Sequence, residues 1–220
     1  GGIGGAADTL VVSDGATAVA TVSADWAPGN QTANDNGTAT LSLAEGVNVD
    51  LRQAAVTTAS EDGYTIDASG NADGSEMIGS TADDVITGGG GNDTLDGSDG
   101  DAGLRGGGGD DTLDGSDGDD TLEGGAGADT LTGGEGSDTY VFAVGDSTAT
   151  ATDSLQEFGA TDRVLLTGQL TETIFWLLSN DDPITFANGE TVFADKFGEG
   201  EFRLRNDTGD SITLNESNVQ

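Results

Sequence analysis

Six aspartates recur through the middle of the chain at multiples of nine residues. Carboxylates are hard oxygen ligands, and a regular series of them is the chemistry of divalent-cation binding. Most residues just before each aspartate are glycine, which permits positive φ and lets backbone carbonyl oxygens crowd around one ion. The six are Asp84, Asp93, Asp111, Asp120, Asp129 and Asp138.

These aspartates hold the sixth position of a nine-residue repeat that runs from Gly79 to Val141 without a slip. Each unit approximates G-G-x-G-x-D-x-U-x, where U is a large apolar residue. Positions one to six predict a loop, and positions seven to nine predict a three-residue strand whose middle residue points inward. The units are GSTADDVIT, GGGGNDTLD, GSDGDAGLR, GGGGDDTLD, GSDGDDTLE, GGAGADTLT and GGEGSDTYV. Their inward residues are Ile86, Leu95, Leu104, Leu113, Leu122, Leu131 and Tyr140.

The ligand set favours calcium. Six to eight oxygen ligands in flexible loops suit calcium better than magnesium, which requires a smaller and more rigid octahedron. Stacked carboxylates would repel one another without a cation, so the energy of binding becomes energy of folding. We therefore expect this segment to bind several Ca²⁺ ions and to be disordered without them.

The composition excludes several functions. The chain has 41 Asp and Glu against 6 Lys and Arg, a formal net charge of -35, which repels nucleic acid and anionic lipid and attracts divalent cations. It has no Cys and no His, which excludes the usual zinc sites and the histidine-dependent nucleophile systems. No apolar run approaches the ~20 residues of a membrane span. We expect a non-catalytic protein with no nucleic-acid partner and no membrane insertion.

The chain divides by composition into residues 1–69, 70–141 and 142–220. In the first region, short β-branched runs alternate apolar and polar side chains and predict strands of a β-solenoid or a small sandwich. The GGAADTL stretch that begins at Gly4 looks like a worn copy of the repeat, so we expect a piece of a longer polypeptide. The predicted strands are Thr17–Ser23, Thr38–Leu43, Val47–Leu51 and Tyr64–Ile66.

The flanks of the repeat have their own signals. Residues 70–78 read as a degenerate turn, because Glu76 lies eight residues before Asp84, one short of the period; phase is then expected to begin at Gly79. Nine of the eleven aromatic residues lie at or beyond Tyr140, which is enough bulk for a C-terminal cap on the open end of a solenoid. Within that region, Ile184–Phe186 and Thr191–Phe193 flank Asn188-Gly189 and predict a hairpin.

The repeats resemble the RTX (repeats-in-toxin) calcium-binding nonapeptides, a β-helix signature. The segment Asp153–Phe158 followed by Asp162–Leu165 is similar to the stretch that follows the repeats in serralysin-type C-terminal modules, with Glu157 in place of the usual second Asp. The resemblance implies an all-β fold. It is a right-handed parallel β-roll, a calcium-bound β-solenoid, preceded by a short-stranded β region and closed by a C-terminal β cap.

In that family two nonapeptides form one eighteen-residue coil. The sequence carries the longer period itself, since residues 88–105 and 106–123 differ at only four positions. Loops eighteen residues apart should therefore stack on one edge, and the resemblance implies an ion between them. The sixth-position Asp of both loops binds it, with carbonyls at positions two and four of the first loop and at positions one and three of the second.

Carried onto this chain, the resemblance implies three complete sites. The first uses Gly89, Gly91, Asp93, Gly106, Gly108 and Asp111. The second, on the same edge, uses Gly107, Gly109, Asp111, Gly124, Ala126 and Asp129. The third, on the opposite edge, uses Ser116, Gly118, Asp120, Gly133, Glu135 and Asp138. The further candidate ligands are Asp84, Gly125 and Gly127.

One unit departs from the pattern. Ala102 occupies the sixth position between Asp84 and Asp120 on the second edge, so the two sites that share its loop each lose a carboxylate and should be weak or empty. Arg105 follows in the same unit, and we expect its charge to offset part of the lost ion charge.

The resemblance implies two functions. In the first, the chain is an extracellular, non-catalytic module of a Gram-negative bacterium, secreted or at the cell surface, which passes the type I secretion machinery unfolded and folds where calcium is abundant. In the second, it is a structural protein that self-associates with calcium, such as a surface-layer, adhesin or matrix subunit. An enzyme or carbohydrate-binding module is a third reading, but paired carboxylates carry little information in so acidic a chain. Light scattering with calcium discriminates between monomers and assemblies.

Overall fold

The structure, a computed structural model, describes most of the chain up to residue 167 and separate strands beyond it. Its described residues form twenty-two strands in four sheets and no helix. None of them therefore forms an apolar helix long enough to cross a membrane. The described residues are 2–3, 10–13, 15–28, 32–34, 37–56, 63–143, 146, 153–159, 161–167, 184–185, 191–198, 201–206 and 211–215.

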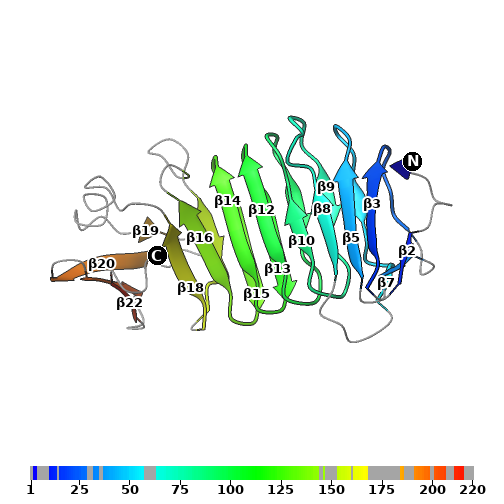
Figure 1. The fold of residues 1–220 in the computed structure, drawn as a ribbon. Helices are drawn as coiled ribbons and strands as arrows, with labels where there is room; N and C mark the ends of the chain where they lie inside the picture. The colour runs from blue at the N-terminus through cyan, green and yellow to red at the C-terminus, as the bar shows by residue number, and fades with distance from the viewer. Residues whose placement is uncertain are drawn as a thin grey trace.

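Two parallel sheets face each other along the molecule (Figure 1), and the chain alternates between them as a β-solenoid. We call them the long sheet and the short sheet. In spatial order, the long sheet consists of β1 (Gly2–Ile3), β3 (Thr17–Val22), β5 (Thr38–Leu43), β8 (Tyr64–Asp67), β10 (Val85–Thr87), β12 (Gly103–Gly108), β14 (Thr121–Ala126), β16 (Thr139–Ala143) and β18 (Arg163–Thr167). The short sheet consists of β6 (Val49–Asp50), β9 (Glu76–Ile78), β11 (Thr94–Asp96), β13 (Thr112–Asp117), β15 (Thr130–Glu135) and β17 (Ser154–Gln156).

Two smaller sheets occur near the ends of the chain. A parallel three-stranded sheet joins β2 (Val11–Val12), β4 (Ala33–Asn34) and β7 (Ala55–Val56). An antiparallel sheet joins β19 (Ile184–Thr185), β20 (Thr191–Gly198), β21 (Glu201–Asn206) and β22 (Ser211–Asn215), and it lies beyond β18 in Figure 1. A capping role for it, like the three-region division of the chain, stays a prediction.

The strand register fixes the size of one coil. In the long sheet Ile86 pairs with Leu104, Leu104 with Leu122 and Leu122 with Tyr140, so each coil takes eighteen residues. In the short sheet Leu95, Leu113 and Leu131 pair with the same spacing. The parallel β-roll expected from the sequence is confirmed.

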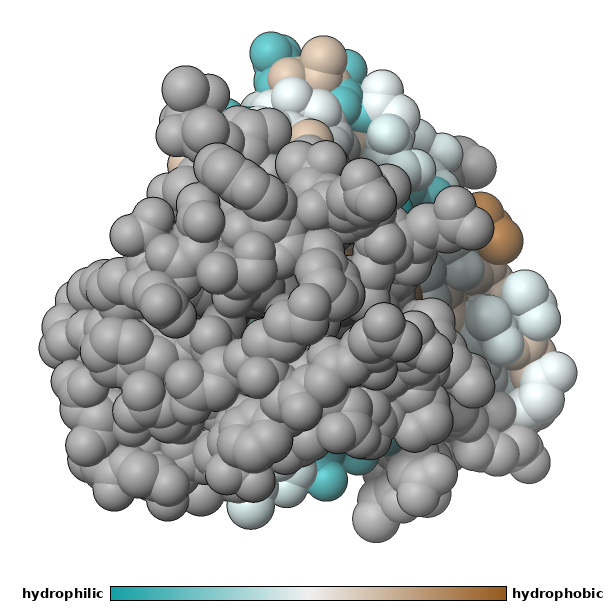
Figure 2. Space-filling view, turned by 90° about the vertical axis from the view of Figure 1, so that its left-hand side faces the viewer, coloured by the Kyte–Doolittle hydropathy of each residue, from teal (hydrophilic) through white to brown (hydrophobic). Residues whose placement is uncertain are grey.

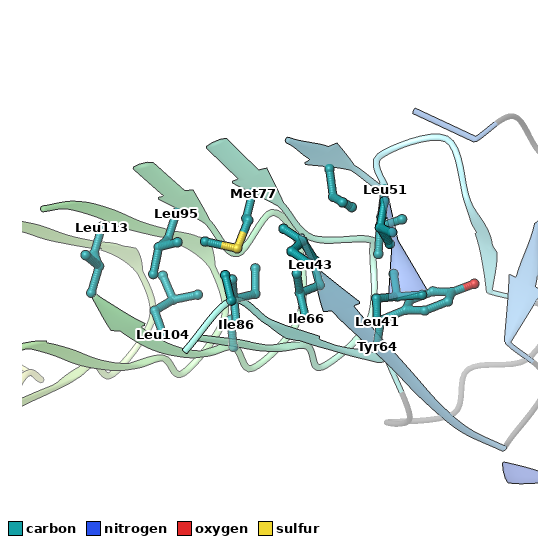
Figure 3. Packing of buried hydrophobic residues seen from close by; sticks show 14 of the residues in the cluster. Leu41, Leu43, Leu51, Tyr64, Ile66, Met77, Ile86, Leu95, Leu104 and Leu113 are labelled. Carbon is teal, nitrogen blue, oxygen red and sulfur yellow. The ribbon is translucent and has the colours of Figure 1, made fainter. Parts of the chain in front are cut away.

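The repeats bury one large side chain per nonapeptide. All seven predicted inward residues are at most 2% exposed and form one column between the two sheets. Figure 3 shows part of this column, from Leu113 toward Tyr64 in the N-terminal coils. The predicted inward positions are therefore confirmed.

The N-terminal coils continue the same two sheets. The predicted strands of this region are confirmed as β3, β5, β6 and β8, with small shifts at their ends. Strand β5 pairs with β8, and β8 pairs with β10 of the repeats, all in parallel. These pairings are those of a solenoid rather than of a sandwich.

The structure corrects the phase of residues 70–78. Strand β9 pairs with β11 so that Met77 lies opposite Leu95, and Ser75 holds the sixth position. The unit is therefore in phase, and its interpretation as an out-of-phase turn was wrong. Serine stands at the sixth position of this unit, where most units have aspartate. The acidic residue used to set the phase, Glu76, is therefore at position seven.

The structure also corrects the strand length. Strands β10 and β11 have the predicted three residues, but β12 to β15 have six and extend into positions one to three of the next unit. The reason is that glycine-rich backbones of successive coils pair directly, as Gly107 does with Gly125 and Ser116 with Gly134.

At the C-terminus the predicted hairpin pairing is confirmed, since Ile184 lies opposite Val192 and Thr185 opposite Thr191. Its turn, at Asn188-Gly189, lies outside the described residues. Figure 2 views the molecule from the end where β18 lies, and the described surface visible there is mainly hydrophilic or intermediate in hydropathy.

Candidate metal centres

The sixth-position residues form two hydrogen-bonded columns, one along each edge of the roll. In each column the backbone N–H of one sixth-position residue donates to Oδ1 of the aspartate one coil later. Every sixth-position aspartate of the repeats is buried, at 2% exposure or less. On the first edge the bonds are Ser75 to Asp93 at 2.7 Å, Asp93 to Asp111 at 2.8 Å and Asp111 to Asp129 at 2.9 Å. On the second edge they are Ala102 to Asp120 at 2.7 Å and Asp120 to Asp138 at 3.0 Å.

Both columns continue past the repeats. Asp153 accepts from Asp129 N–H, and Asp162 accepts from Asp138 N–H, each at 3.1 Å. Neither was among the predicted ligands. The signal for them is that an apolar residue, Leu155 or Val164, follows each aspartate two positions later in a strand, in the same way as in the repeats.

Four buried carboxylate oxygens in these columns have no hydrogen-bond partner among the described residues. They are the Oδ2 atoms of Asp111, Asp120, Asp129 and Asp138. An unpartnered buried carboxylate oxygen is costly, and it costs most when the group is ionised. A cation bound at this atom would remove the cost.

A backbone carbonyl oxygen lies beside two of these atoms. A Cβ built on Gly106 would overlap Asp111 Oδ2 and would lie 2.6 Å from the carbonyl oxygen of Gly124. A Cβ built on Gly115 would overlap Asp120 Oδ2 and lie 2.5 Å from the carbonyl oxygen of Gly133. In each case an aspartate oxygen of one loop lies beside the position-one carbonyl oxygen of the loop one coil later. The predicted second and third sites require this arrangement.

The remaining predicted ligands lie at the same loop interfaces. In the second site the carbonyl oxygens of Gly107 and Gly109 face Gly125 and Gly127 of the next coil, and Ala126 O accepts Gly109 N–H at 2.9 Å. Positive φ values turn these carbonyls toward the neighbouring coil: φ is 116° at Gly107 and 115° at Gly109. With Asp111, Gly124 and Asp129, this interface holds all six predicted residues.

The third site repeats this arrangement on the second edge. The carbonyl oxygens of Ser116 and Gly118 face Gly134 and Gly136 of the next coil, and Glu135 O accepts Gly118 N–H at 3.0 Å. Ser116 adopts a positive φ of 73° although it has a side chain. The position therefore needs the left-handed conformation even where glycine is absent.

The predicted first site differs. Asp93 Oδ2 and the carbonyl oxygen of Gly106 meet beside Gly88, but Asp93 Oδ2 already accepts Gly89 N–H at 2.8 Å. Asp84 is similar, because its Oδ1 accepts Tyr64 N–H and its Oδ2 accepts the N–H and the hydroxyl of Ser80. These two aspartates are satisfied by hydrogen bonds alone.

Ala102 interrupts the second column as predicted. Its methyl group lies beside Gly97, 2.7 Å from where a Cβ on that glycine would be, and it carries no oxygen to face the next loop. The carbonyl oxygen of Gly115 faces this methyl group instead of a carboxylate. Arg105 does not compensate at the loop, because its guanidinium pairs with Glu123 at 3.0 Å on the outer face of the long sheet.

Burial changes the acidity of the columns. Desolvation is the largest cause, and it raises the pKa of Asp111 and of Asp120 to about 7 and that of Asp84 to about 6. It also raises the pKa of Asp129 and Asp138. Backbone N–H groups lower these values in part, and neighbouring carboxylates raise them further. Burial therefore opposes ionisation of these carboxylates, and a cation bound to them would favour it.

The donor set fits calcium. Among the described residues, no three Asp, Glu, Cys or His side chains converge on one point. Each of the three predicted complete loop interfaces instead offers two aspartates together with backbone carbonyls, so every donor is an oxygen. Ca²⁺ accepts such flexible all-oxygen sets.

A second ladder, at position five, was not predicted from the sequence. Asp101 N–H donates to Asp83 Oδ1, Asp119 N–H to Asp101 Oδ1 and Ser137 N–H to Asp119 Oδ1, each at 2.8 Å. These bonds run in the opposite direction to those at position six. They explain why Asp or Asn often precedes the ligand aspartate, and they assign a structural role to part of the acidic charge.

Tyr140 ends the series of inward leucines. Its hydroxyl accepts Gly133 N–H at 2.8 Å and donates to the carbonyl oxygen of Gln156 at 3.3 Å, so it bridges two coils. The Tyr140 hydroxyl and Asp138 Oδ2 both lie beside Gly133. A Cβ built on Gly133 would lie 2.6 Å from the hydroxyl oxygen and would overlap Asp138 Oδ2.

We expect Tyr140→Phe to destabilise the calcium-bound protein by about 1–3 kcal/mol, because a buried backbone N–H and a partly buried carbonyl oxygen lose a hydrogen bond. Tyr64→Phe is the matched control, because the buried Tyr64 hydroxyl has no hydrogen-bond partner in the described part of the chain. Urea unfolding in excess calcium measures both. Equal midpoints for the two variants would contradict the bridging role.

Comparison with known families agrees with this geometry. Residues 69–102 and 105–140 match a family model described as RTX calcium-binding nonapeptide repeat (4 copies). The match begins at the unit that the structure brings into phase, breaks within the unit of Ala102 and ends at Tyr140, so the serralysin-type likeness of the later segment stays a prediction. No similar protein was found among curated proteins. Residues 69–102 and 105–140 are therefore RTX calcium-binding nonapeptide repeats, which bind several Ca²⁺ ions in a parallel β-roll.

Proposed function

We propose that the chain is a calcium-triggered folding module in which Ca²⁺ binds between stacked loops and completes the β-roll. One observation carries the proposal: four buried Oδ2 atoms have no hydrogen-bond partner among the described residues, and two of them lie beside a carbonyl oxygen of the next loop. Calcium bound at these atoms neutralises the carboxylate charge. An apolar core of one large residue per unit cannot offset that charge. Calcium binding and folding of the roll are then one event.

The best-supported ion positions are the second and third sites, centred on Asp111 with Asp129 and on Asp120 with Asp138. The first site is less well supported, because both carboxylate oxygens of Asp93 already accept backbone N–H bonds. The two sites that involve Ala102 are the least well supported. We infer one strong ion position on each edge and a graded series around it.

The proposed setting is extracellular. RTX repeat proteins are typically secreted by Gram-negative bacteria, and extracellular calcium modules have site affinities of about 10⁻⁴–10⁻³ M. A chain that stays unfolded at cytosolic calcium would pass type I secretion machinery and fold outside. The repeats themselves carry no catalytic role in this proposal, since RTX β-rolls are generally structural.

Circular dichroism during a calcium titration tests the proposal directly. We expect the β signal of the roll to appear with calcium, to disappear with EDTA and to respond weakly to magnesium. A β signal that is already complete in EDTA would refute coupled folding.

Restoring the missing carboxylate should strengthen binding. We expect Ala102→Asp to raise calcium affinity or cooperativity, because both sites that share its loop regain a ligand. Ala128→Asp is the control, since it adds the same charge at position five, where side chains accept backbone bonds outside the sites. The comparison is made by isothermal titration calorimetry. If the two variants raise the calcium affinity equally, the added negative charge and not a restored ligand is the cause.

Calcium-dependent self-association is the alternative function. The roll is a stack of parallel strands, and β17 and β18 pair with no later strand in the described part of the chain. Unpaired strand edges are natural surfaces for assembly. Light scattering during the same titration decides: a monomer throughout supports the folding module, and filaments or sheets support the structural role.

A further inference from the structure

The coils before the roll are stabilised by different interactions from the coils within it. We propose that the coils built from β2 to β11 fold without calcium and provide the template on which the calcium-dependent coils, from β12 onward, assemble. This inference rests on the proposed function, because it assumes that the later coils need calcium. It adds a fixed boundary and a direction of folding.

The core of the N-terminal coils is larger. Strand β5 alone buries Ala39, Leu41 and Leu43, and Trp26 and Tyr64 are also buried in this part. A third sheet, β2–β4–β7, widens the coils. In β12 to β15, by contrast, each strand buries a single leucine. Because stability from burial scales with apolar area, the earlier coils gain more from each turn of the chain.

Neutral side chains connect the loops of these early coils. The Asn34 side chain, 1% exposed, donates from Nδ2 to the carbonyl oxygens of Gly37 at 3.1 Å and Gly63 at 2.6 Å. Asn71 Nδ2 donates to Ala44 O at 3.0 Å. In these early coils a side-chain amide donates to the loop carbonyl oxygens, whereas in the roll calcium would bind the equivalent oxygens. The early loops therefore need no ion.

The column aspartates change character along the chain. Asp84 and Asp93 have both carboxylate oxygens hydrogen-bonded to backbone N–H groups, from Tyr64 and Ser80 and from Ser75 and Gly89. From Asp111 onward, the four repeat aspartates each retain a buried oxygen that has no partner in the part of the chain that the structure describes. Ala102 lies between the two groups and contributes no carboxylate. Metal dependence therefore begins between Asp93 and Asp111.

The calcium-free block presents ready strand edges to the roll. Strand β12 pairs with β10, and β13 pairs with β11, each in parallel and in the eighteen-residue register. Parallel pairing of distant segments is slow to start, because the entropic cost of closing the loop comes before the stabilising contacts form. Preformed β10 and β11 edges remove that first step and set the register.

Hydrogen exchange of the full chain, followed by mass spectrometry at pH 7.5, tests the boundary. In EDTA we expect protected amides in β5 and β8 and rapid exchange in β13 to β15, with protection throughout once calcium is added. Rapid exchange in β5 and β8 in EDTA would overturn this inference and leave coupled folding intact. Protection of β13 to β15 in EDTA would overturn the proposed function itself.

Pulse labelling after calcium addition tests the direction. We expect amides of β12 and β13 to become protected before those of β15 and β16, and the reverse order would overturn the template. Asn34→Ala should shorten the protection of β5 and β8 in EDTA several-fold. Asn92→Ala, at an exposed position-five site just before β11, should leave it unchanged. Equal effects of the two variants would remove the role assigned to the Asn34 amide.

Discussion

Replacing Asp111 by alanine should lower the apparent affinity for calcium at least about tenfold, the minimum loss seen when even an outer-shell partner of a metal is removed. Asp111 belongs to two loop interfaces: its Oδ2 faces Gly124, and its Oδ1 accepts Asp93 N–H at 2.8 Å. The variant therefore damages the best-supported site on this edge and the site before it. Cooperativity should fall as well, because the two sites share this side chain.

The neighbouring aspartate provides the control. Asp110→Ala removes the same charge, but Asp110 is an exposed position-five residue whose Oδ1 accepts Ala128 N–H at 3.0 Å. Calorimetric titration of the two variants and the parent chain separates coordination from charge. If Asp110→Ala lowers the affinity as much as Asp111→Ala, general electrostatics and not the loop interface governs binding.

Lowering the pH should stabilise the calcium-free roll. Burial raises the pKa of Asp111 and Asp120 from 3.8 to about 7 in the folded chain. A carboxyl with a raised pKa favours the folded state when it is protonated, so this stability is present below the ordinary value and is lost as pH rises through about 7. In EDTA we expect the β signal of the roll to be weak at pH 8 and to grow as pH falls toward 5.5.

Calcium should show the opposite dependence. Protons and calcium compete for the same carboxylates, so the apparent affinity should fall as pH drops below about 7. The double variant Asp111→Asn with Asp120→Asn should lose most of both dependences, because an amide does not titrate near neutral pH. Circular dichroism in EDTA and calcium titrations at pH 8 and pH 6 measure the two effects. An EDTA spectrum that does not change between pH 8 and 5.5 would contradict the buried, partnerless state of these side chains.

Much of the roll was predictable because its sequence is periodic. A nine-residue repeat fixes which residue of each strand points inward, and Leu95, Leu113 and Leu131 follow it without exception. The eighteen-residue coil was equally visible in the near-identity of residues 88–105 and 106–123. The missing carboxylate at Ala102 needed only residue type, because a methyl group offers no oxygen.

Other features depended on what a side chain meets in the next coil. Ser75 holds a sixth position, but without an aspartate the sequence offered no marker for its phase. Asp153 and Asp162 join the columns across coils longer than eighteen residues, so a strict nine-residue count does not reach them. Non-local pairing rather than local pattern places these residues.

The sequence by itself determined the ligand chemistry, the period and the inward face, because these follow from residue type and spacing along one chain. The tertiary structure decided which aspartates have both carboxylate oxygens hydrogen-bonded. Asp93 and Asp111 occupy the same position in units that differ at one residue, yet a backbone N–H satisfies Oδ2 of the first, while Oδ2 of the second has no partner among the described residues. That difference arises within the folded loop, because Gly89 N–H reaches Asp93 Oδ2 four residues on. Gly107, with a φ of 116°, makes no such bond to Asp111 in the described structure.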